Sequence, residues 1–207
     1  MTSTGQVDLY WLPLGAGERS GCVRWNGRLF ESIVARRTRR MPSDLYHSAL
    51  EIHLDDVRFT IEMTPVWGNG SGDRGVVATG PVGLRALGRS RFFRYEVRCW
   101  RGGSIPDLAE AAGGRRTLRT DPHVARRVLD LVSTVPTATW GRDELGTGDM
   151  WNSNSLTSWL IASAGIGTDD VAPPLGGRAP GWTAGLAVAR RGPAVSSVGP
   201  TPTTRSP

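Results

Sequence analysis

Two runs of alternating apolar and polar residues, between His47 and Thr64, give the clearest structural signal in the chain. They flank Asp55-Asp56, which we interpret as a hairpin turn, although Asp-Asp is a weaker turn signal than Asp-Gly. A symmetric turn at this point makes three cross-strand pairs that are apolar on both strands: Leu54 with Val57, Ile52 with Phe59, and Leu50 with Ile61. This agreement supports the register, because a shift of one residue would turn every side chain to the other face of the sheet.

The opposite face of this hairpin carries most of the polar side chains. The first strand contributes His47, Ala49, Glu51 and His53, and the second contributes Arg58, Thr60, Glu62 and Thr64. In this register Thr64 lies across from His47, and Glu62 is the diagonal neighbour of His47. Glu51 and Glu62 could simply line a solvated sheet face, as the polar side of an antiparallel strand normally does, and His53, beside the turn, is expected to be solvated.

The remaining pattern alternates strands and helices without a regular order. We expect strands at residues 8–14 and 92–100, and helices at 28–37, from Asp121-Pro122 onward, and at 152–164. The helix after Asp121-Pro122 has its apolar stripe at Val124, Val128, Leu131, Val132 and Val135. Residues 68–75 and 173–182 are expected to be irregular, and the Pro-, Ser- and Thr-rich tail, residues 191–207, to be disordered. The pattern predicts an α+β domain over residues 5–190, with an antiparallel sheet or partial barrel packed against helices.

Composition limits the function classes. No apolar run approaches the roughly 20 residues that span a bilayer, and the first residues lack a signal-peptide pattern, so we expect a cytoplasmic protein. The two cysteines, Cys22 and Cys99, form no CxxC pair, and the three histidines lie in no metal-ligand cluster, so neither a metal nor a cofactor is expected. The oligomeric state is left open.

The net charge of +6 comes from arginine alone, because the chain contains no lysine. The densest cluster, residues 35–40, lies at the end of an expected helix, where arginine favours the negative end of the helix dipole. The other arginines are scattered along the chain. We therefore disfavour a nucleic-acid-binding function.

The stretch Asn152-Ser153-Asn154 opens the last expected helix and is the main chemical candidate. A serine hydroxyl becomes a nucleophile when a base, usually histidine, removes its proton. The free backbone N–H groups of a first helical turn can bind a developing oxyanion. A Ser153–His47–Glu62 arrangement would be catalytic if these segments met, with Asn152, Asn154, Thr64 and Trp151 as candidate oxyanion or substrate-binding residues.

Each of these residues also has a structural interpretation. Serine and asparagine are among the best helix caps, so Asn152 and Ser153 could simply begin a helix. His47 could be a hydrogen-bonded residue of a sheet. Residue types alone do not decide between the two interpretations.

Two motifs, in this order, resemble those of the circularly permuted papain-like superfamily, which includes the lecithin:retinol acyltransferase-like proteins and the PPPDE peptidase-like proteins. Residues 46–52 (YHSALEI) are similar to its H-x-G/A-hydrophobic strand, and residues 151–156 (WNSNSL) to its helix-opening N-C-N-S-F form. The resemblance covers residues 45–165 and implies His47 as base and Ser153 as nucleophile, with Glu62 or Thr64 as the third polar group. This chain departs from the pattern in carrying serine where the family has cysteine.

Two functions follow from the resemblance. The first is an acyl-group hydrolase or transferase that acts on an amide, thioester or ester of a small molecule or peptide through Ser153 and His47. The second is a catalytically inactive papain-like binding module, with Trp67, Trp151 and Trp182 near the rim of its cleft.

Overall fold

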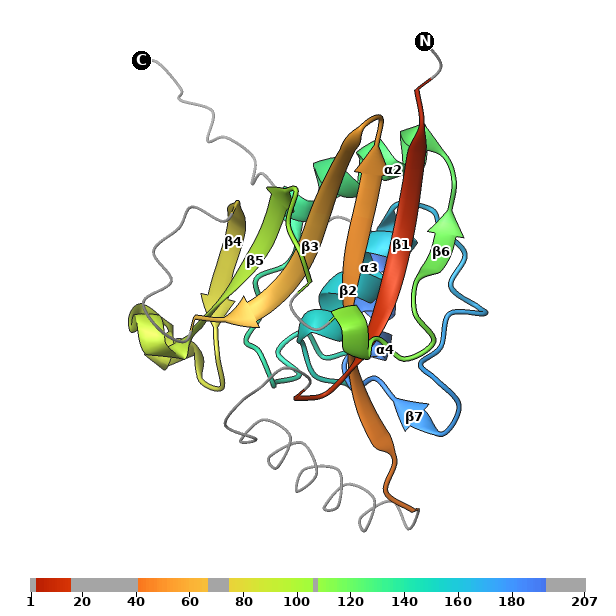
Figure 1. Cartoon of the computed structure of the whole chain (residues 1–207). Coiled ribbons are helices and arrows are strands. Elements are labelled where there is room, and N and C mark those ends of the chain that lie inside the picture. The colour runs from red at the N-terminus through yellow and green to blue at the C-terminus, as the bar shows by residue number, and fades with distance from the viewer. Residues whose placement is uncertain (1–2, 16–40, 67–74, 106–107, 193–207) are drawn as a thin grey trace, which may run out of the picture.

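A computed structural model describes residues 3–15, 41–66, 75–105 and 108–192, and it shows an α+β architecture (Figure 1). Six strands form an open sheet in the order β4-β5-β3-β2-β1-β6, in which all neighbours are antiparallel. They are β1 (Gly5–Pro13), β2 (Asp44–Leu54), β3 (Val57–Pro65), β4 (Val76–Pro81), β5 (Arg94–Arg101) and β6 (Arg116–Arg119). A two-residue strand, β7 (Gly177–Arg178), pairs with the start of β2 in parallel.

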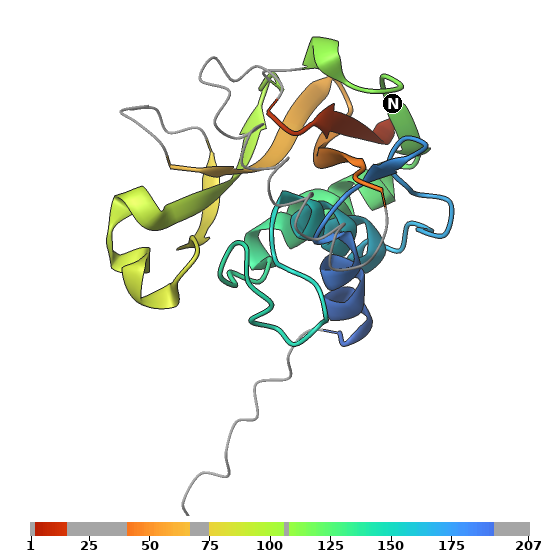
Figure 2. The ribbon, with the colours of Figure 1, turned by 90° about the horizontal axis from the view of Figure 1, so that it is seen from below.

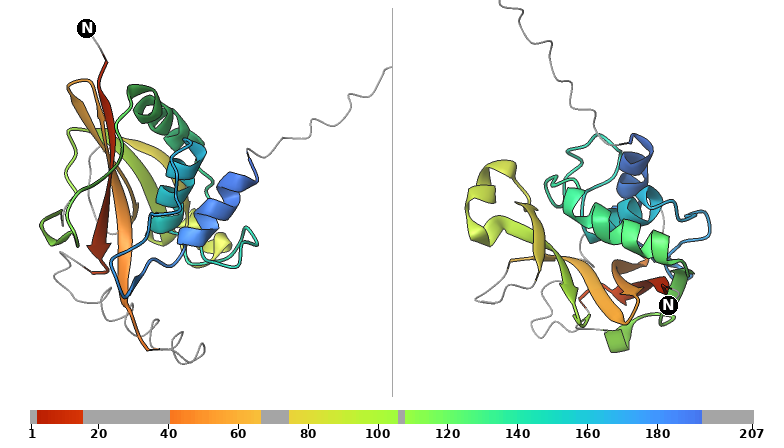
Figure 3. Two further views of the ribbon diagram at one scale, coloured as in Figure 1. Left: turned by 90° about the vertical axis from the view of Figure 1, so that its right-hand side faces the viewer. Right: turned by 90° about the horizontal axis from the view of Figure 1, so that it is seen from above.

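Three α-helices cover one face of this sheet, as the side view in Figure 3 shows: α2 (Pro122–Leu131), α3 (Ser153–Ser163) and α4 (Trp182–Arg190). The main core lies between them and the sheet, and its largest fully buried members include Trp151, Leu9, Leu50 and Leu160. A smaller cluster lies on the other face, where Tyr10, Leu12, Ala49 and Ile105 pack with the short 3₁₀ turn η3 (Leu108–Glu110). The sheet therefore has apolar contacts on both faces over β1 and β2.

The predicted hairpin register is confirmed. Leu54 pairs with Val57, Ile52 with Phe59 and Leu50 with Ile61, and Asp55 has the positive φ of 52° that a tight turn requires. The recorded β2–β3 pairs end at Leu50 and Ile61, whereas β3 continues as far as Pro65 as a partner of β5. The predicted neighbours of His47 on β3 therefore do not form pairs with it.

Helices α2 and α3 begin at the N-cap residues that the sequence predicts. Asp121 accepts hydrogen bonds from His123 N and Val124 N, and Pro122 is the first helical residue. Asn152 caps α3, and Gly165, with a φ of 82°, follows its last turn. Of the predicted apolar stripe of α2, Val128 lies within the helix and is buried, and Val132 and Val135 are buried just beyond its end.

Other predictions were wrong or incomplete. Phe92 and Phe93 do not begin a strand; they lie in η2 (Arg91–Phe93), a 3₁₀ turn that follows η1 (Arg85–Arg89), and both rings are exposed. Strands β4, β6 and β7 and helix α4 were not predicted. The predicted helix 28–37, the basic cluster 35–40, Cys22, Trp67 and most of the tail lie outside the described residues, as does most of the loop 68–75.

Helix α4 packs against α3, and Figure 2 shows the two helices side by side. A Cβ at Gly185 would lie 2.1 Å from Ser155 O and 2.1 Å from Ser158 Oγ, so only glycine fits at this contact. Among the described residues, no helix is long and apolar enough to cross a membrane.

Candidate functional site

The N-terminus of α3 is held by its own side chains. Asn152 accepts hydrogen bonds from Asn154 N and Ser155 N, and Ser155 Oγ in turn accepts one from Asn152 N at 3.1 Å. This is a capping box with serine at the third helical position. Ser155 Oγ also donates to Gly181 O at 2.7 Å, which ties the cap to the start of α4.

Asn154 joins three segments of the chain. Its amide nitrogen donates to Tyr46 O and to Pro180 O, both at 2.9 Å, and its oxygen accepts a hydrogen bond from Ser48 Oγ at 2.8 Å. The side chain is almost fully buried, so these bonds replace all contact with water. Asn152 donates to the same Pro180 carbonyl at 2.8 Å. The two asparagines, predicted as oxyanion or substrate-binding residues, hold β2, α3 and the segment before α4 together.

Ser153 and His47 do not meet. Ser48 and Leu50 of β2 face the helices, since Ser48 bonds to Asn154 and Leu50 lies in the main core. Because side chains alternate along a strand, His47 faces the other side of the sheet. Its partner across the strand pair is Leu12, which belongs to the cluster on that other face. Ser153 is the first residue of α3, on the helical side, and is 6% exposed.

The surroundings of His47 also disfavour its predicted role as a base. Burial lowers the pKa of His47 to about 4, since its surroundings disfavour the charged imidazolium. A general base works best when its pKa lies near the operating pH. His47 is therefore neutral and weakly basic near pH 7.

Glu62 and Thr64 of β3 pair with β5, and the recorded β2–β3 pairs include neither of them. Their pairing partners are Arg98 and Glu96, and Arg98 Nη1 lies 3.7 Å from Glu62 Oε1. Arg98 also contacts Glu96 at 2.7 Å, so it joins two carboxylates of the same sheet face. Neither residue forms a strand pair with His47.

Two of the three tryptophans predicted at the rim of a cleft, Trp151 and Trp182, are core residues, and the third lies outside the described residues. Trp151 is 1% exposed and Trp182 is 8% exposed, and Trp182 packs against Trp11 with ring centroids 4.9 Å apart. Both rings stabilise the layer between sheet and helices. Neither is available to a ligand in this structure.

A row of buried polar side chains crosses the face of the sheet that was expected to be wet. Asp8 and Glu51 are direct cross-strand partners, as are Glu51 and Thr60, and all three are buried. Asp8 accepts hydrogen bonds from Gln6 and Thr117, and Glu51 accepts one from Tyr10 at 2.9 Å. Burial, followed by the bond to Glu51, raises the pKa of Tyr10, which keeps its hydroxyl a donor.

Two side chains, His53 and Arg58, lie at the margin of this row. His53 Nε2 lies 3.5 Å from Asp8 Oδ2 and 4.0 Å from Glu51 Oε2, and Arg58 Nε lies 3.8 Å from Glu51 Oε1. The sequence held one sign of this row, since Asp8 stands in an otherwise apolar run, but its pairing with Glu51 of β2 appears only in the fold. Within the described ranges no group of three or more His, Cys, Asp or Glu side chains could hold a metal ion.

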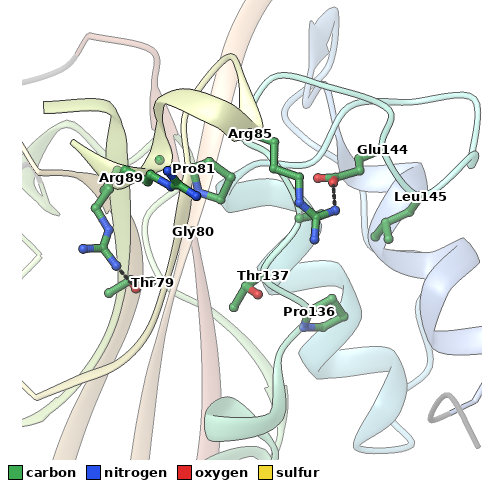
Figure 4. A pocket seen from close by; sticks show the side chains of 12 residues that line it. Thr79, Gly80, Pro81, Arg85, Arg89, Pro136, Thr137, Glu144 and Leu145 are labelled. Carbon is green, nitrogen blue, oxygen red and sulfur yellow. Dashed lines mark hydrogen bonds and ion pairs between the residues drawn. The ribbon is translucent and has the colours of Figure 1, made fainter. Parts of the chain in front are cut away.

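A cleft at one end of the sheet was missed by the sequence interpretation. It has a volume of about 540 Å³ and lies between the β4–β5 connection and the chain that leads from α2 to α3 (Figure 4). The described residues that line it include three arginines, Arg85, Arg89 and Arg94, and one acid, Glu144. Thr79, Thr137, Pro81, Pro136 and Leu145 supply hydroxyl and apolar surface.

Two of these arginines have partners in the cleft and one does not. Arg85 Nη1 contacts Glu144 Oε1 at 2.6 Å, the pair that faces across the cleft in Figure 4, and Arg94 donates to Thr79 Oγ1 at 3.2 Å. Hydrogen bonds from Thr139, and then the contact with Arg85, lower the pKa of Glu144. Arg89 has no hydrogen bond or ion pair with the residues described here. The sequence signal, four arginines and no acid in residues 85–94, was read only as scattered charge.

No protein-family model, curated protein or solved structure matches this chain. The family resemblance therefore stays a prediction from two motifs.

Proposed function

We propose that this protein is a binding module whose ligand carries an anionic group, held in the cleft of Arg85, Arg89 and Arg94. The main support for this proposal is the charge of the cleft. Its described lining has three guanidinium groups and one carboxylate. Guanidinium groups bind phosphate and carboxylate through paired, charge-assisted hydrogen bonds. A volume of about 540 Å³ is within the range of small-molecule sites, roughly 300–1,000 Å³.

The geometry favours binding without a reaction. Among the described residues that line the cleft there is no histidine, cysteine or serine. Glu144 is engaged by Arg85 and by Thr139 N, each at 2.6 Å. Thr79 and Thr137 can donate to anionic oxygens, and the proline and leucine side chains can pack on the rest of a small ligand. Such a set of groups can position an anion but offers no evident base or nucleophile.

The cleft proposal is tested with inorganic phosphate and pyrophosphate by titration calorimetry. Arg89→Gln should weaken pyrophosphate binding about tenfold, because one charge-assisted contact to an exposed site is worth roughly 1–1.5 kcal/mol. Arg126→Gln is the matched control, since Arg126 is an exposed arginine on α2, outside the cleft. Equal affinity in the wild type and the Arg89 variant, or equal loss in both variants, would contradict an anion site at this cleft.

The acyl hydrolase or transferase hypothesis for Ser153 and His47 has its own test. A serine-reactive fluorophosphonate probe should not label the protein, because the imidazole and the hydroxyl lie on opposite sides of the sheet. A known serine hydrolase run beside it controls for the probe. Labelling that disappears in Ser153→Ala and in His47→Ala would restore the hydrolase and refute a purely binding role.

A further inference from the structure

The β4–β5 connection ends in an exposed apolar tip, which we define as Leu84, Leu87, Phe92 and Phe93. Their exposed fractions are 53%, 40%, 73% and 44%. They make up four of the seven large hydrophobic side chains exposed among the described residues. Figures 1 and 2 show this connection, in yellow-green, projecting from the end of the sheet away from the helices. Such a concentration of exposed apolar groups is typical of an interaction surface.

The tip is surrounded by positive charge. Arg85, Arg89, Arg91 and Arg94 lie in the same connection or directly after it, all four are exposed, and the segment 75–95 contains no Asp or Glu. Three of these four arginines also line the cleft. The cleft and the tip are therefore two parts of one surface. The arginines of the cleft attract anions, and the apolar side chains of the tip are stabilised when they are removed from water.

We propose that this surface docks on an anionic phospholipid bilayer, with a headgroup phosphate at the cleft and the tip among the upper acyl chains. This inference rests on the proposed function, since it names the source of the anion. Interfacial proteins combine Phe or Leu with basic residues in this way, because burial of apolar area adds to attraction by anionic lipids. The described part of the chain has no membrane-spanning helix, which fits docking on the surface.

Two other occupants fit the surface less well. A second copy of the chain paired through the same patch would set four arginines against four arginines, since a two-fold interface repeats one surface on both sides. Single-stranded RNA would use arginine and phenylalanine, but Leu84 and Leu87 offer no ring for stacking. The two phenylalanines are also consecutive residues of one 3₁₀ turn and do not line an extended groove.

Sedimentation with vesicles tests the proposal. The full chain should partition to vesicles of phosphatidylcholine and phosphatidylglycerol and not to phosphatidylcholine alone. Phe92→Ser combined with Phe93→Ser should lower the partition coefficient at least about tenfold while leaving pyrophosphate binding unchanged. Leu175→Ser is the matched control, because Leu175 is fully exposed but lies just before β7, outside the surface. Arg89→Gln should lower both partition and pyrophosphate binding.

The outcomes separate this inference from the function it rests on. Pyrophosphate binding without vesicle partition, or partition that the Phe92 and Phe93 changes leave intact, would overturn membrane docking and keep the anion site. Partition that depends on the phenylalanines without any pyrophosphate binding would overturn the cleft as the headgroup site. Tighter, phenylalanine-dependent binding to a single-stranded RNA oligonucleotide than to vesicles would also overturn the proposal.

Discussion

Replacing Asn154 with alanine is expected to lower the free energy of unfolding by about 3–5 kcal/mol, as measured by urea denaturation. The change leaves Ser48 Oγ and Tyr46 O without their partner and also removes one of two donors to Pro180 O. A buried polar group that loses its hydrogen bond costs about 1–3 kcal/mol, and the Asn154 side chain forms hydrogen bonds with three such groups.

Ser153→Ala provides the matched comparison one residue away. Ser153 makes no hydrogen bond through its side chain to any described residue, so its loss should change stability by less than about 1 kcal/mol. If Ser153→Ala destabilised the protein as much as Asn154→Ala, the assignment of the structural role to Asn154 would be wrong. The pair thus shows which residue of the Asn-Ser-Asn motif holds the fold.

Acid is expected to destabilise the protein through His47, by about 3 kcal/mol between pH 6.5 and pH 4. Burial lowers the pKa of this imidazole from 6.5 to about 4 in the folded state. Above pH 6.5 the residue is neutral in both the folded and unfolded states, so its neutral form costs nothing there. As the pH falls below 6.5 the unfolded chain binds a proton that the folded chain does not, and stability is lost at roughly 1.4 kcal/mol per pH unit until the folded residue is itself protonated.

The measurement is the pH dependence of unfolding in His47→Gln against the wild type. Carboxylates also titrate in this window, so the difference between the two curves isolates His47. The difference should be constant above pH 7, and wild-type stability should fall progressively relative to His47→Gln from pH 6.5 to pH 4. His123→Gln is the control, because His123 is exposed at the start of α2. Parallel curves for wild type and His47→Gln would mean that His47 is not buried as described.

The site could be predicted only where local chemistry decides it. Asn152 caps α3 because its short side chain reaches the free N–H groups of the next residues, a contact set within one turn of chain. The role of Asn154 could not be foreseen, because its partners Tyr46 and Pro180 come from segments far away in the sequence. The arginine cleft was missed for the same reason: Arg89 and Thr137 meet only in the folded chain.

The order of residues was enough to predict the β2–β3 register, the caps of α2 and α3, and the α+β class. These features depend on side-chain periodicity and on hydrogen bonds between residues close in the sequence, and both can be inferred from the local sequence. Which face of β2 the helices cover, in contrast, is set by packing between distant parts of the chain. That choice placed Ser48 against α3 and His47 against Leu12, because successive side chains of a strand point to opposite sides. The order of the two motifs therefore did not determine how they are placed, since the packing of helices on a sheet depends on the whole apolar surface.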